Sequence, residues 1–419
     1  MANNQFEVVI VGAGAAGIGA ARRLREAGVN SLLVEARTRP GGRAWTVADP
    51  SGFPLDLGCG WLHSADRNPW RGIAEAQGCA IDKTLPPWSR AAMRIGMSNA
   101  DSAGFAEAMG LFRERVNGLD DAARDRPASA LLDPNSSWNG LIDAVSTYYS
   151  GVELSRVSAR DLARYDDSGV NWRVAEGYGK VIADHAADLQ IRLDCAVQRI
   201  DRRARQLRVE TSAGALIADA VIVTLPTNLL AERPDLFLPA LSEKTAAAAG
   251  LPLGLADKLF LSLEGAEQFD EETRAFGAAR TATAGYHVRP FGRPLIEAFF
   301  GGALAADLEK AGDDAFANFA IEELVGLFGS DMARRVKPLC VHGWNSDPFA
   351  RGSYSCALPG QADCRARLAA PVDNRLFFAG EACSPHDYST AHGAYATGVA
   401  AADAALASLR LVHPRAPMA

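Results

Sequence analysis

The chain has 419 residues, of which 48% are hydrophobic, and its formal net charge is -7. A chain of this length can bury large cores, and it predicts two domains or one domain with a large insertion. The mild acidity argues against nucleic-acid binding, for which clustered basic residues are the expected footprint.

The first predicted element is a strand that leads into a glycine-rich turn. Residues 6–11, FEVVIV, form an apolar run typical of a fully buried strand, and GAGAAG follows directly. The sequence IGAARRLREAG then predicts a helix that ends at Gly28, and SLLVEA predicts a second strand. Strand, helix and strand fit within about 30 residues, which is typical of a nucleotide-binding βαβ unit.

The spacing of the glycines supports this interpretation. Gly12 permits the tight turn, Gly14 lets the backbone approach a pyrophosphate, and Gly17 lets helix and strand pack closely. The phosphate would meet the helix N-terminus, where free N–H groups favour an anion. Glu35, at the end of the second strand, is placed to accept hydrogen bonds from ribose hydroxyls. We therefore predict that this unit binds a dinucleotide.

The first turn is common to NAD-binding and FAD-binding proteins, but the next segments favour FAD. Arg37 and Arg43 flank a glycine pair in EARTRPGGRAWT, an arrangement that can hold a pyrophosphate a second time. The following stretch, GFPLDLGCGWLH, is glycine-rich and can lie flat against a large planar group. In a simple dehydrogenase the chain would instead continue into the next helix.

The middle of the chain alternates between two kinds of pattern. From residue 71 to about 180 the pattern is helical and irregular, whereas IRLDCAVQRI, QLRVET and ADAVIVTLP predict strands within 190–225. Alternating segments within 255–345, including DKLFLSLE and PLIEAFFGG, predict an antiparallel or mixed sheet. The closing stretch, RLFFAGEACSPHDYSTAHGAYATG, predicts a strand, an acid, a loop and a small-residue helix.

Cysteine usage and hydropathy predict an intracellular protein. The seven cysteines are scattered and form no CxxC pair, so we expect reduced thiols, no disulfide framework and no metal site. The first residues lack the pattern of a signal peptide, and no apolar run reaches the roughly 18 residues that span a bilayer. We expect cytoplasmic localisation and no membrane partner.

Six segments in order resemble one family, the flavin-containing amine oxidases, which covers monoamine oxidases, polyamine oxidases and lysine-specific histone demethylases. The segments are VIVGAGAAGIGAARRL…VEARTRPGGRAWT, DLGCGWLH, ADAVIVTLP, GLADKLFLSLE, GWNSDPFARGSYSCALPG and FFAGEACSPHDYSTAHGAYATG. They span nearly the whole chain, and residues 71–165 and 265–290 match least. The overall pattern is similar to the polyamine-oxidase-like branch.

The resemblance implies an α/β fold with two domains. A Rossmann-like FAD-binding domain, with a parallel sheet flanked by helices, would comprise residues 1–70, 181–245 and 350–419. A second α+β domain for the substrate, built on a mixed or antiparallel sheet, would comprise residues 71–180 and 246–349.

The resemblance also implies how an extended FAD is held. Its ADP half would lie on the N-terminal turn, Glu381 would bond the ribityl or pyrophosphate region, and the amide of Ala391 would face the flavin. A helix N-terminus at Ala391 suits the negative charge of a reduced flavin. The implied cofactor-binding residues are Gly12, Gly14, Ala16, Gly17, Glu35, Ala36, Arg37, Gly42, Arg43, Gly58, Trp61, Val197, Trp344, Gly380, Glu381, Thr390 and Ala391.

Lys258 is the expected catalytic residue. Strand alternation in DKLFLSLE would place Leu259 and Leu261 on one face and Lys258 and Phe260 on the other. By resemblance, Lys258 corresponds to the lysine that holds a water molecule beside flavin N5. The alternative is an exposed lysine on the surface of a domain.

Tyr354 and Thr390 are expected to contact the substrate. By resemblance, Tyr354 forms one wall of an aromatic cage before the flavin, where an electron-rich face suits a cationic amine; the alternative is a core tyrosine. Monoamine oxidases have a second tyrosine where this chain has Thr390, which favours longer or secondary amines. Tyr354 also stands where monoamine oxidases attach flavin through a cysteine, with Cys356 two residues away, so we expect noncovalent FAD.

Further residues have competing interpretations. Trp61 and His63 would line the substrate side of the flavin, although His63 can equally be a supporting group. Trp344 would pack near the flavin or simply fill the core. Cys383 is not expected to be a redox thiol, and His392 is expected to be structural.

The predicted reaction is oxidation of an amine by FAD and oxygen, in which hydride passes from the carbon beside nitrogen to flavin N5 and hydrogen peroxide is formed. The substrate would be a polyamine, diamine or secondary amine. The alternatives are a monoamine or amino-acid oxidase, a flavin dehydrogenase or desaturase with another electron acceptor, a chromatin-type demethylase, and a noncatalytic flavin-binding protein. The sequence leaves open whether the protein is a monomer or a homodimer.

Overall fold

The computed structural model describes residues 4–89, 94–95, 97–122, 124–277 and 282–412. The chain divides into two compact units. Unit 1 comprises Met1–Trp45, Gly179–Pro252 and Asp363–Ala419, and unit 2 comprises Thr46–Tyr178 and Leu253–Ala362.

These boundaries differ from the expected ones at four places. Residues 179–180 and 246–252, which we expected in the substrate domain, belong to unit 1. Residues 46–70 and 350–362, which we expected in the FAD-binding domain, belong to unit 2. Backbone pairing is the reason: the amide of Leu62 donates to the carbonyl of Trp172, and Tyr354 pairs with Gly254. Such long-range pairs leave no local pattern in the sequence.

Unit 1 is built on a mixed sheet with a parallel centre. Its strand order is β12-β9-β10-β11-β1-β2-β8, and β20 also pairs with β11. The strands are β1 (Gln5–Val11), β2 (Ser31–Val34), β8 (Ile191–Arg192), β9 (Val197–Asp201), β10 (Leu207–Thr211), β11 (Gly214–Val223), β12 (Phe237–Leu238) and β20 (Leu376–Phe378). Val8, Val9 and Ile10 have no exposed surface, because helices and neighbouring strands cover both faces of a central parallel strand.

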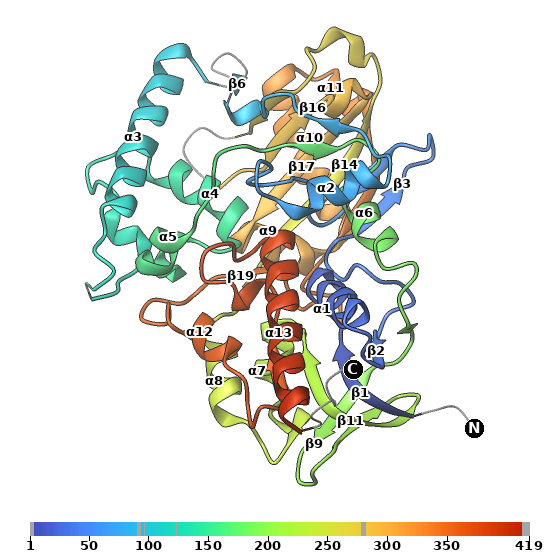
Figure 1. Cartoon of the computed structure of the whole chain (residues 1–419). Helices are drawn as coiled ribbons and strands as arrows, with labels where there is room; N and C mark the ends of the chain where they lie inside the picture. Colours follow the sequence, from blue (N-terminus) through green and yellow to red (C-terminus); the bar gives the residue numbers. More distant parts are fainter. Residues whose placement is uncertain (1–3, 90–93, 96, 123, 278–281, 413–419) are drawn as a thin grey trace. The chain divides into compact units, whose positions relative to one another are not determined.

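The first and last helices of unit 1 pack against each other (Figure 1). The helices are α1 (Ala15–Glu26), α6 (Tyr178–Asp184), α7 (Thr227–Glu232), α8 (Ser242–Ala249), α12 (Cys364–Ala369) and α13 (Ala391–Val412). A Cβ atom on Gly398 of α13 would lie 1.9 Å from the carbonyl oxygen of Ala16 in α1. The small residues of both helices are therefore needed for this close approach.

Unit 2 is built on a largely antiparallel sheet with the order β18-β14-β17-β16-β15-β6. Its strands are β6 (Arg94–Ile95), β14 (Ala256–Leu263), β15 (Thr273–Phe276), β16 (Gly285–Val288), β17 (Leu295–Gly301) and β18 (Val336–His342). Three short pairs complete the unit: β3 (Thr46–Ala48) with β4 (Pro54–Asp56), β5 (Ile81–Asp82) with β7 (Arg173–Val174), and β13 (Leu253–Gly254) with β19 (Tyr354–Ser355).

Apart from α2, the helices of unit 2 contribute to two separate cores. Their bounds are α2 (Pro69–Ala76), α3 (Asn99–Asn117), α4 (Asn139–Ser150), α5 (Ala159–Arg164), α9 (Gly302–Ala311), α10 (Asp313–Phe328) and α11 (Met332–Arg335). One core includes Phe105 of α3 and Leu141 of α4. The other includes Phe316 of α10, which meets the ring of Phe300 on β17, together with the sheet residues Leu259 and Leu261.

The two faces of β14 separate as strand alternation predicts. Leu259 and Leu261 lie in the core, whereas Lys258 and Phe260 line a cavity on the other face. The structure therefore has a Rossmann-like unit and an α+β unit on a mixed sheet, and the predicted fold class is confirmed.

Candidate active site

In unit 1, the turn after β1 has the geometry that its glycines predict. Gly12 has φ +100°, and a Cβ on Gly17 would lie 1.9 Å from the Gly12 carbonyl oxygen. A Cβ on Gly14 would meet nothing within 4 Å. The turn is therefore closed on the helix side and open beside Gly14, where a phosphate can approach. Ala16 lies in the first turn of α1.

The acid at the end of β2 fastens this turn. Glu35 is 5% exposed, and its Oε2 accepts a hydrogen bond from the Ala13 amide at 2.7 Å. Its Oε1 accepts from the amide of Arg37 at 2.9 Å, across Ala36. Each carboxylate oxygen has capacity for a further donor, so the predicted bonds to ribose hydroxyls are compatible with this arrangement.

The second glycine segment lies against the first. The amide of Gly41 donates to the carbonyl of Ala13 at 2.8 Å, and a Cβ on Gly42 would lie 3.3 Å from the Cα of Gly14. Gly42 has φ +59°, a conformation that favours glycine. The predicted pairing of the two glycine segments around one ligand therefore has a structural basis.

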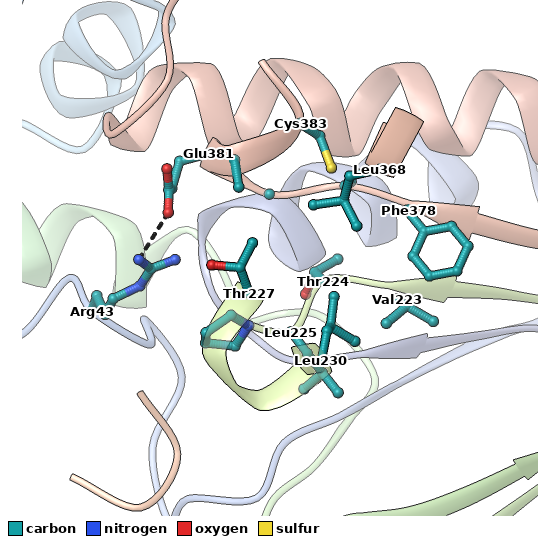
Figure 2. Close-up of a pocket in the computed structure, with 14 residues that line it drawn as sticks. Arg43, Val223, Thr224, Leu225, Thr227, Leu230, Leu368, Phe378, Glu381 and Cys383 are labelled. Carbon is teal, nitrogen blue, oxygen red and sulfur yellow. Dashed lines mark hydrogen bonds and ion pairs between the residues drawn. The ribbon is translucent and has the colours of Figure 1, made fainter. Parts of the chain in front are cut away.

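A small pocket lies at the carboxyl ends of β11 and β20 (Figure 2). Arg43 and Glu381 form an ion pair at 2.9 Å at its edge, and Gly380, with φ +136°, also lines it. The Thr227 hydroxyl lines the same pocket; it is buried and has no hydrogen-bond partner among the described residues. Ligands of open α/β sheets bind at this edge, so a buried hydroxyl without a partner here fits a polar ligand.

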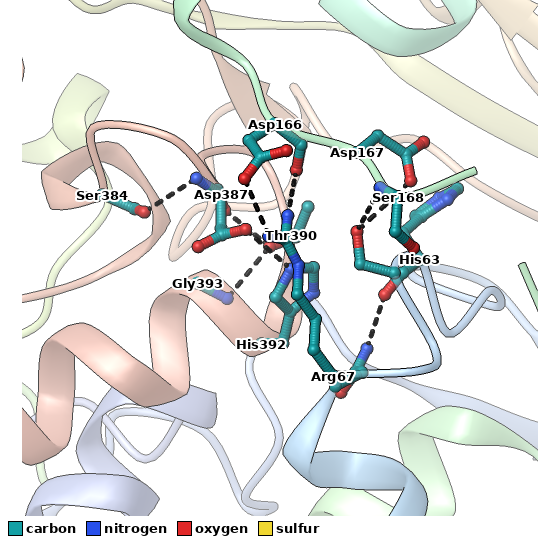
Figure 3. Close-up of polar contacts among 12 residues, drawn as sticks. His63, Arg67, Asp166, Asp167, Ser168, Ser384, Asp387, Thr390, His392 and Gly393 are labelled. Atoms are coloured by element: carbon teal, nitrogen blue, oxygen red, sulfur yellow. Dashed lines mark hydrogen bonds and ion pairs between the residues drawn. The ribbon is translucent and has the colours of Figure 1, made fainter. Parts of the chain in front are cut away.

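The N-terminus of α13 is capped by Thr390, the residue directly before the helix (Figure 3). The Thr390 hydroxyl accepts from the Gly393 amide at 3.0 Å and donates to the Asp387 carbonyl at 2.6 Å. Nε2 of His392 lies 3.3 Å from Oδ1 of Asp387. The contacts of Thr390 and His392 hold the start of the helix in place, and Ala391 is the first residue of the helix. The predicted ligand contacts of Thr390 and Ala391 remain predictions.

Two further residues of unit 1 have defined surroundings. Val197 is the first residue of β9 and pairs with Thr211. Burial raises the pKa of the Cys383 thiol to about 12. A thiol with such a pKa is protonated at neutral pH, which argues against a redox role for Cys383.

In unit 2, Lys258 is buried and its ammonium group has two partners. Its side chain is 5% exposed, and Nζ donates to the carbonyl of Asp56 at 2.9 Å and lies 2.8 Å from Oε1 of Glu297. The backbone at Gly60 lies close to Nζ of Lys258, since a Cβ atom on Gly60 would be 3.2 Å from this nitrogen. These contacts exclude the alternative of an exposed surface lysine.

The cavity beside Lys258 has a mixed lining. Aromatic rings come from Trp61, Phe260 and Phe291, and charged groups come from Asp56, Arg173, Lys258, Arg293 and Glu297. The combination of ring faces and charges of both signs suits a ligand with both apolar and polar groups.

Trp61 is held among three neighbours. The Trp88 ring meets it edge-on at 4.4 Å, the His287 ring stacks at 6.5 Å, and the guanidinium of Arg173 lies 4.8 Å from its centre. Trp61 therefore presents a fixed ring to the cavity, as its predicted role at the substrate requires.

His63 sits in a loop that is fastened to residues 166–171. Its Nδ1 lies 2.5 Å from Oδ1 of Asn171, and Arg67 pairs with Asp166 at 2.7 Å (Figure 3). The bond to Asn171 fixes the orientation of the His63 ring. A supporting role and a substrate contact are both compatible with this position.

Tyr354 is half-buried on β19, and its hydroxyl donates to the carbonyl of Tyr148. Burial raises the pKa of Tyr354, so the phenol stays neutral. Tyr148 in turn meets the ring of Phe299 edge-on at 5.8 Å. Tyr354 is thus oriented by its hydroxyl, and its predicted role as a cage wall remains a prediction.

Trp344 is 1% exposed, and its Nε1 donates to the carbonyl of Leu57 at 3.2 Å. Its amide donates to Oδ1 of Asp257 at 3.1 Å. Gly58 follows Leu57 directly, so this bond fixes the glycine-rich stretch. Trp344 therefore fills the core and supports the glycine-rich stretch at Leu57 and Gly58.

The sequence analysis missed the acidic and basic groups around Lys258. Glu297, His287, Glu272 and Arg173 were not singled out, although Glu297 is an acid inside the apolar run LIEAFF. An acid at such a position is a signal of a buried pair. The register that places it beside Lys258 is a tertiary property.

A family model described as flavin containing amine oxidoreductase matches residues 15–406. The chain belongs to this family. It is therefore a flavin-dependent oxidoreductase that acts on CH–NH groups, and its cofactor is FAD.

Curated relatives and solved structures agree with this assignment. "Probable polyamine oxidase 4" of Arabidopsis thaliana is 30% identical over 95% of this chain and 86% of the relative. "Polyamine oxidase 2" of Arabidopsis thaliana is 31% identical over 94% of this chain and 87% of the relative. A solved putrescine oxidase variant has a TM-score of 0.78 at 17% identity, covering 97% of this chain and 99% of that chain, which shows a shared fold.

Unit 1 fits the FAD of this amine oxidoreductase family. The open side of Gly14, the carboxylate of Glu35 and the pocket with the unpartnered Thr227 hydroxyl supply the space and the polar groups that a dinucleotide needs. Among the described residues, no group of three or more His, Cys, Asp and Glu side chains is arranged to hold a metal ion. In the part of the chain that the structure describes, no helix is long and apolar enough to cross a membrane.

Proposed function

We propose that the protein oxidises polyamines or related diamines and secondary amines, with dioxygen as the electron acceptor. The net reaction would convert a secondary amine, dioxygen and water into an aldehyde, a primary amine and hydrogen peroxide. FAD, when bound, would accept the hydride from the carbon beside nitrogen. The relatives named polyamine oxidases, at 30% and 31% identity over most of both chains, support this substrate class.

The observation that carries the proposal is the buried Lys258 at a cavity with aromatic and charged walls. An alkyl ammonium chain needs apolar contact along its methylenes and negative or π-rich groups near its nitrogens. Trp61 and Phe291 offer the first, and Asp56 and Glu297 offer negative charge.

Within the reaction, Lys258 would position a solvent molecule beside the reacting centre. Nζ has three N–H donors, of which one meets the Asp56 carbonyl and one meets Glu297. The third is left for a ligand in the cavity. Trp61, Tyr354 and His63 would orient the amine, and Thr390 would leave room for a longer or secondary amine.

The discriminating experiment is anaerobic bleaching of the flavin absorption by a panel of monoamines, diamines, polyamines and amino acids, followed by a peroxide assay in air. We expect the fastest bleaching with polyamines or diamines, and one equivalent of peroxide per amine oxidised. Bleaching only by amino acids or monoamines would overturn the substrate class. Bleaching without peroxide in air would indicate a dehydrogenase with another acceptor.

The lysine-specific histone demethylases are a second class of relative. One from Arabidopsis thaliana is 27% identical over 94% of this chain but only 57% of the relative. A methylated histone peptide in the same panel tests this alternative, and we expect it to leave the flavin oxidised.

A further inference from the structure

Lys258 is the first member of a buried chain of alternating charges in unit 2. Oε1 of Glu297 lies 2.8 Å from Lys258 Nζ, and Oε2 of Glu297 lies 3.9 Å from Nδ1 of His287. Nε2 of His287 lies 2.8 Å from Oε2 of Glu272, and Oε1 of Glu272 lies 2.7 Å from Arg173. The other carboxylate on Arg173 is Asp82, at 2.6 Å.

The sheet fixes the order of this chain. His287 on β16 and Glu297 on β17 are direct register partners, and Glu297 is in turn opposite Phe260 on β14. Lys258 lies two residues before Phe260 and therefore on the same face. Rigid strands thus set the spacing of three polar side chains, which a loop would not do as accurately.

The carboxylates of Glu297 and Glu272 are charged although they are buried. Burial alone would raise the pKa of Glu297, but the positive charges of Lys258, His287 and Arg173 lower it below its ordinary value. The same balance lowers the pKa of Glu272 to about 2, with His287 and Arg173 as the compensating neighbours. Removing one partner from such a buried pair leaves an uncompensated charge.

We propose that Glu297 is a positioning residue for the amine oxidation, and that it couples the charge of Lys258 to the protonation of His287. This inference depends on the proposed role of Lys258. With Glu297 and the Asp56 carbonyl as fixed acceptors, Nζ can present only its remaining N–H to the cavity.

His287 contacts both Glu297 and Glu272 in this chain of charges. Histidine is the side chain that changes charge near neutral pH, and here it shares Glu297 with Lys258. When His287 is neutral, Glu297 interacts with Lys258 as its closest cation; when His287 is charged, the carboxylate is divided between two cations. The other charged groups near the chain are Arg274, which is the register partner of His287 on β15, and Asp56 and Arg293, which line the cavity with Lys258 and Glu297.

The test compares holoenzymes of the wild type, Glu297→Gln, Glu297→Asp and His287→Gln. The control is Glu323→Gln, because Glu323 bonds the hydroxyl of Tyr286 on the opposite face of the same sheet. The first readout is the rate at which an amine-directed acylating reagent modifies Lys258 over a pH series, followed by peptide mass spectrometry. The second is the pH profile of kcat and kcat/KM with the best amine.

We expect Glu297→Gln to label Lys258 about 10-fold faster than the wild type at one pH, because loss of the counter-charge favours the reactive neutral amine. Glu297→Asp should fall between the two, and Glu323→Gln should match the wild type. His287→Gln should keep Lys258 slowly labelled but remove one inflection from the pH profile of kcat, with little change in KM.

The outcomes separate this inference from the proposed function. A labelling curve for Glu297→Gln identical to that of Glu323→Gln overturns the positioning role, whatever the activity. A pH profile that His287→Gln leaves unchanged overturns the coupling to His287. A flavin that no amine bleaches overturns the proposed function, even when the labelling of Lys258 shifts.

Discussion

The guanidinium of Arg43 lies 2.9 Å from the carboxylate of Glu381, although 338 positions separate them in the chain. The Glu381 side chain is 7% exposed and also accepts the Ser389 amide at 3.0 Å. One ion pair therefore joins the second glycine segment to the residues before α13, at the pocket where we place part of the FAD.

Arg43→Met tests this pair. The change leaves a buried carboxylate without its cation, which costs about 3 kcal/mol in comparable cases, and it removes a guanidinium suited to a pyrophosphate. We expect a lower melting temperature and at least about 10-fold weaker FAD retention, or about 1.4 kcal/mol. Arg23→Met is the control, because its pair with Asp403 at 2.6 Å is exposed. Equal FAD retention in both variants would contradict the assignment.

Gly17 and Gly14 offer a matched comparison within one turn. Gly17→Ala would bring a Cβ to 1.9 Å from the Gly12 carbonyl oxygen, so we expect poor folding and little soluble protein. Gly14→Ala meets nothing within 4 Å in the protein and should fold. Its methyl group would occupy the side that we assign to the pyrophosphate. Thermal melting and flavin content measure the two effects, and full flavin content in Gly14→Ala would refute that placement.

Lys258→Met tests the catalytic assignment. We expect flavin reduction by amine or its reoxidation by oxygen to slow on the order of 100-fold, the size typical of lost proton handling, while FAD stays bound. Stopped-flow absorbance measures both half-reactions. Lys310→Met, near the exposed end of α9, should behave as the wild type. Rates for Lys258→Met equal to those of the control would remove Lys258 from the mechanism.

Asp257 predicts a pH dependence of stability. It has no exposed surface, and burial together with the nearby Glu309 raises its pKa well above the ordinary value. The folded state therefore holds a proton that the unfolded state releases above about pH 4. The free energy of unfolding falls as pH rises from about 4 to the raised pKa of Asp257, by up to about 1.4 kcal/mol per pH unit.

Asp257→Asn removes this titration and keeps the acceptor for the Trp344 amide, which Oδ1 of Asp257 accepts at 3.1 Å. We expect its melting temperature to exceed that of the wild type at pH 8 and the difference to shrink towards pH 5. Asp307→Asn, at an exposed position on α9, should show the wild-type slope. A parallel pH dependence in all three proteins would show that Asp257 does not titrate in this range.

The local features of the fold were predictable because they depend on neighbours in sequence. The glycine spacing from Gly12 to Gly17 predicts the turn, and the alternation around Lys258 predicts which face enters the core. The residues of the six segments identify the family for the same reason, since each segment fulfils a local steric or bonding requirement. The domain boundaries were less predictable, because residues 46–70 join unit 2 through backbone pairs with the distant residues Val170 and Trp172.

The amino-acid sequence alone predicts a dinucleotide turn, a small-residue closing helix and a lysine on the polar face of a strand. Which charges surround that lysine depends on the tertiary structure. Glu297 and His287 lie beside Lys258 because β14, β17 and β16 are adjacent in one register, and hydrogen bonding between strands sets that register. The periodicity of a single strand contains no information about its neighbour, so the electrostatics of this site appear only when the sheet is assembled.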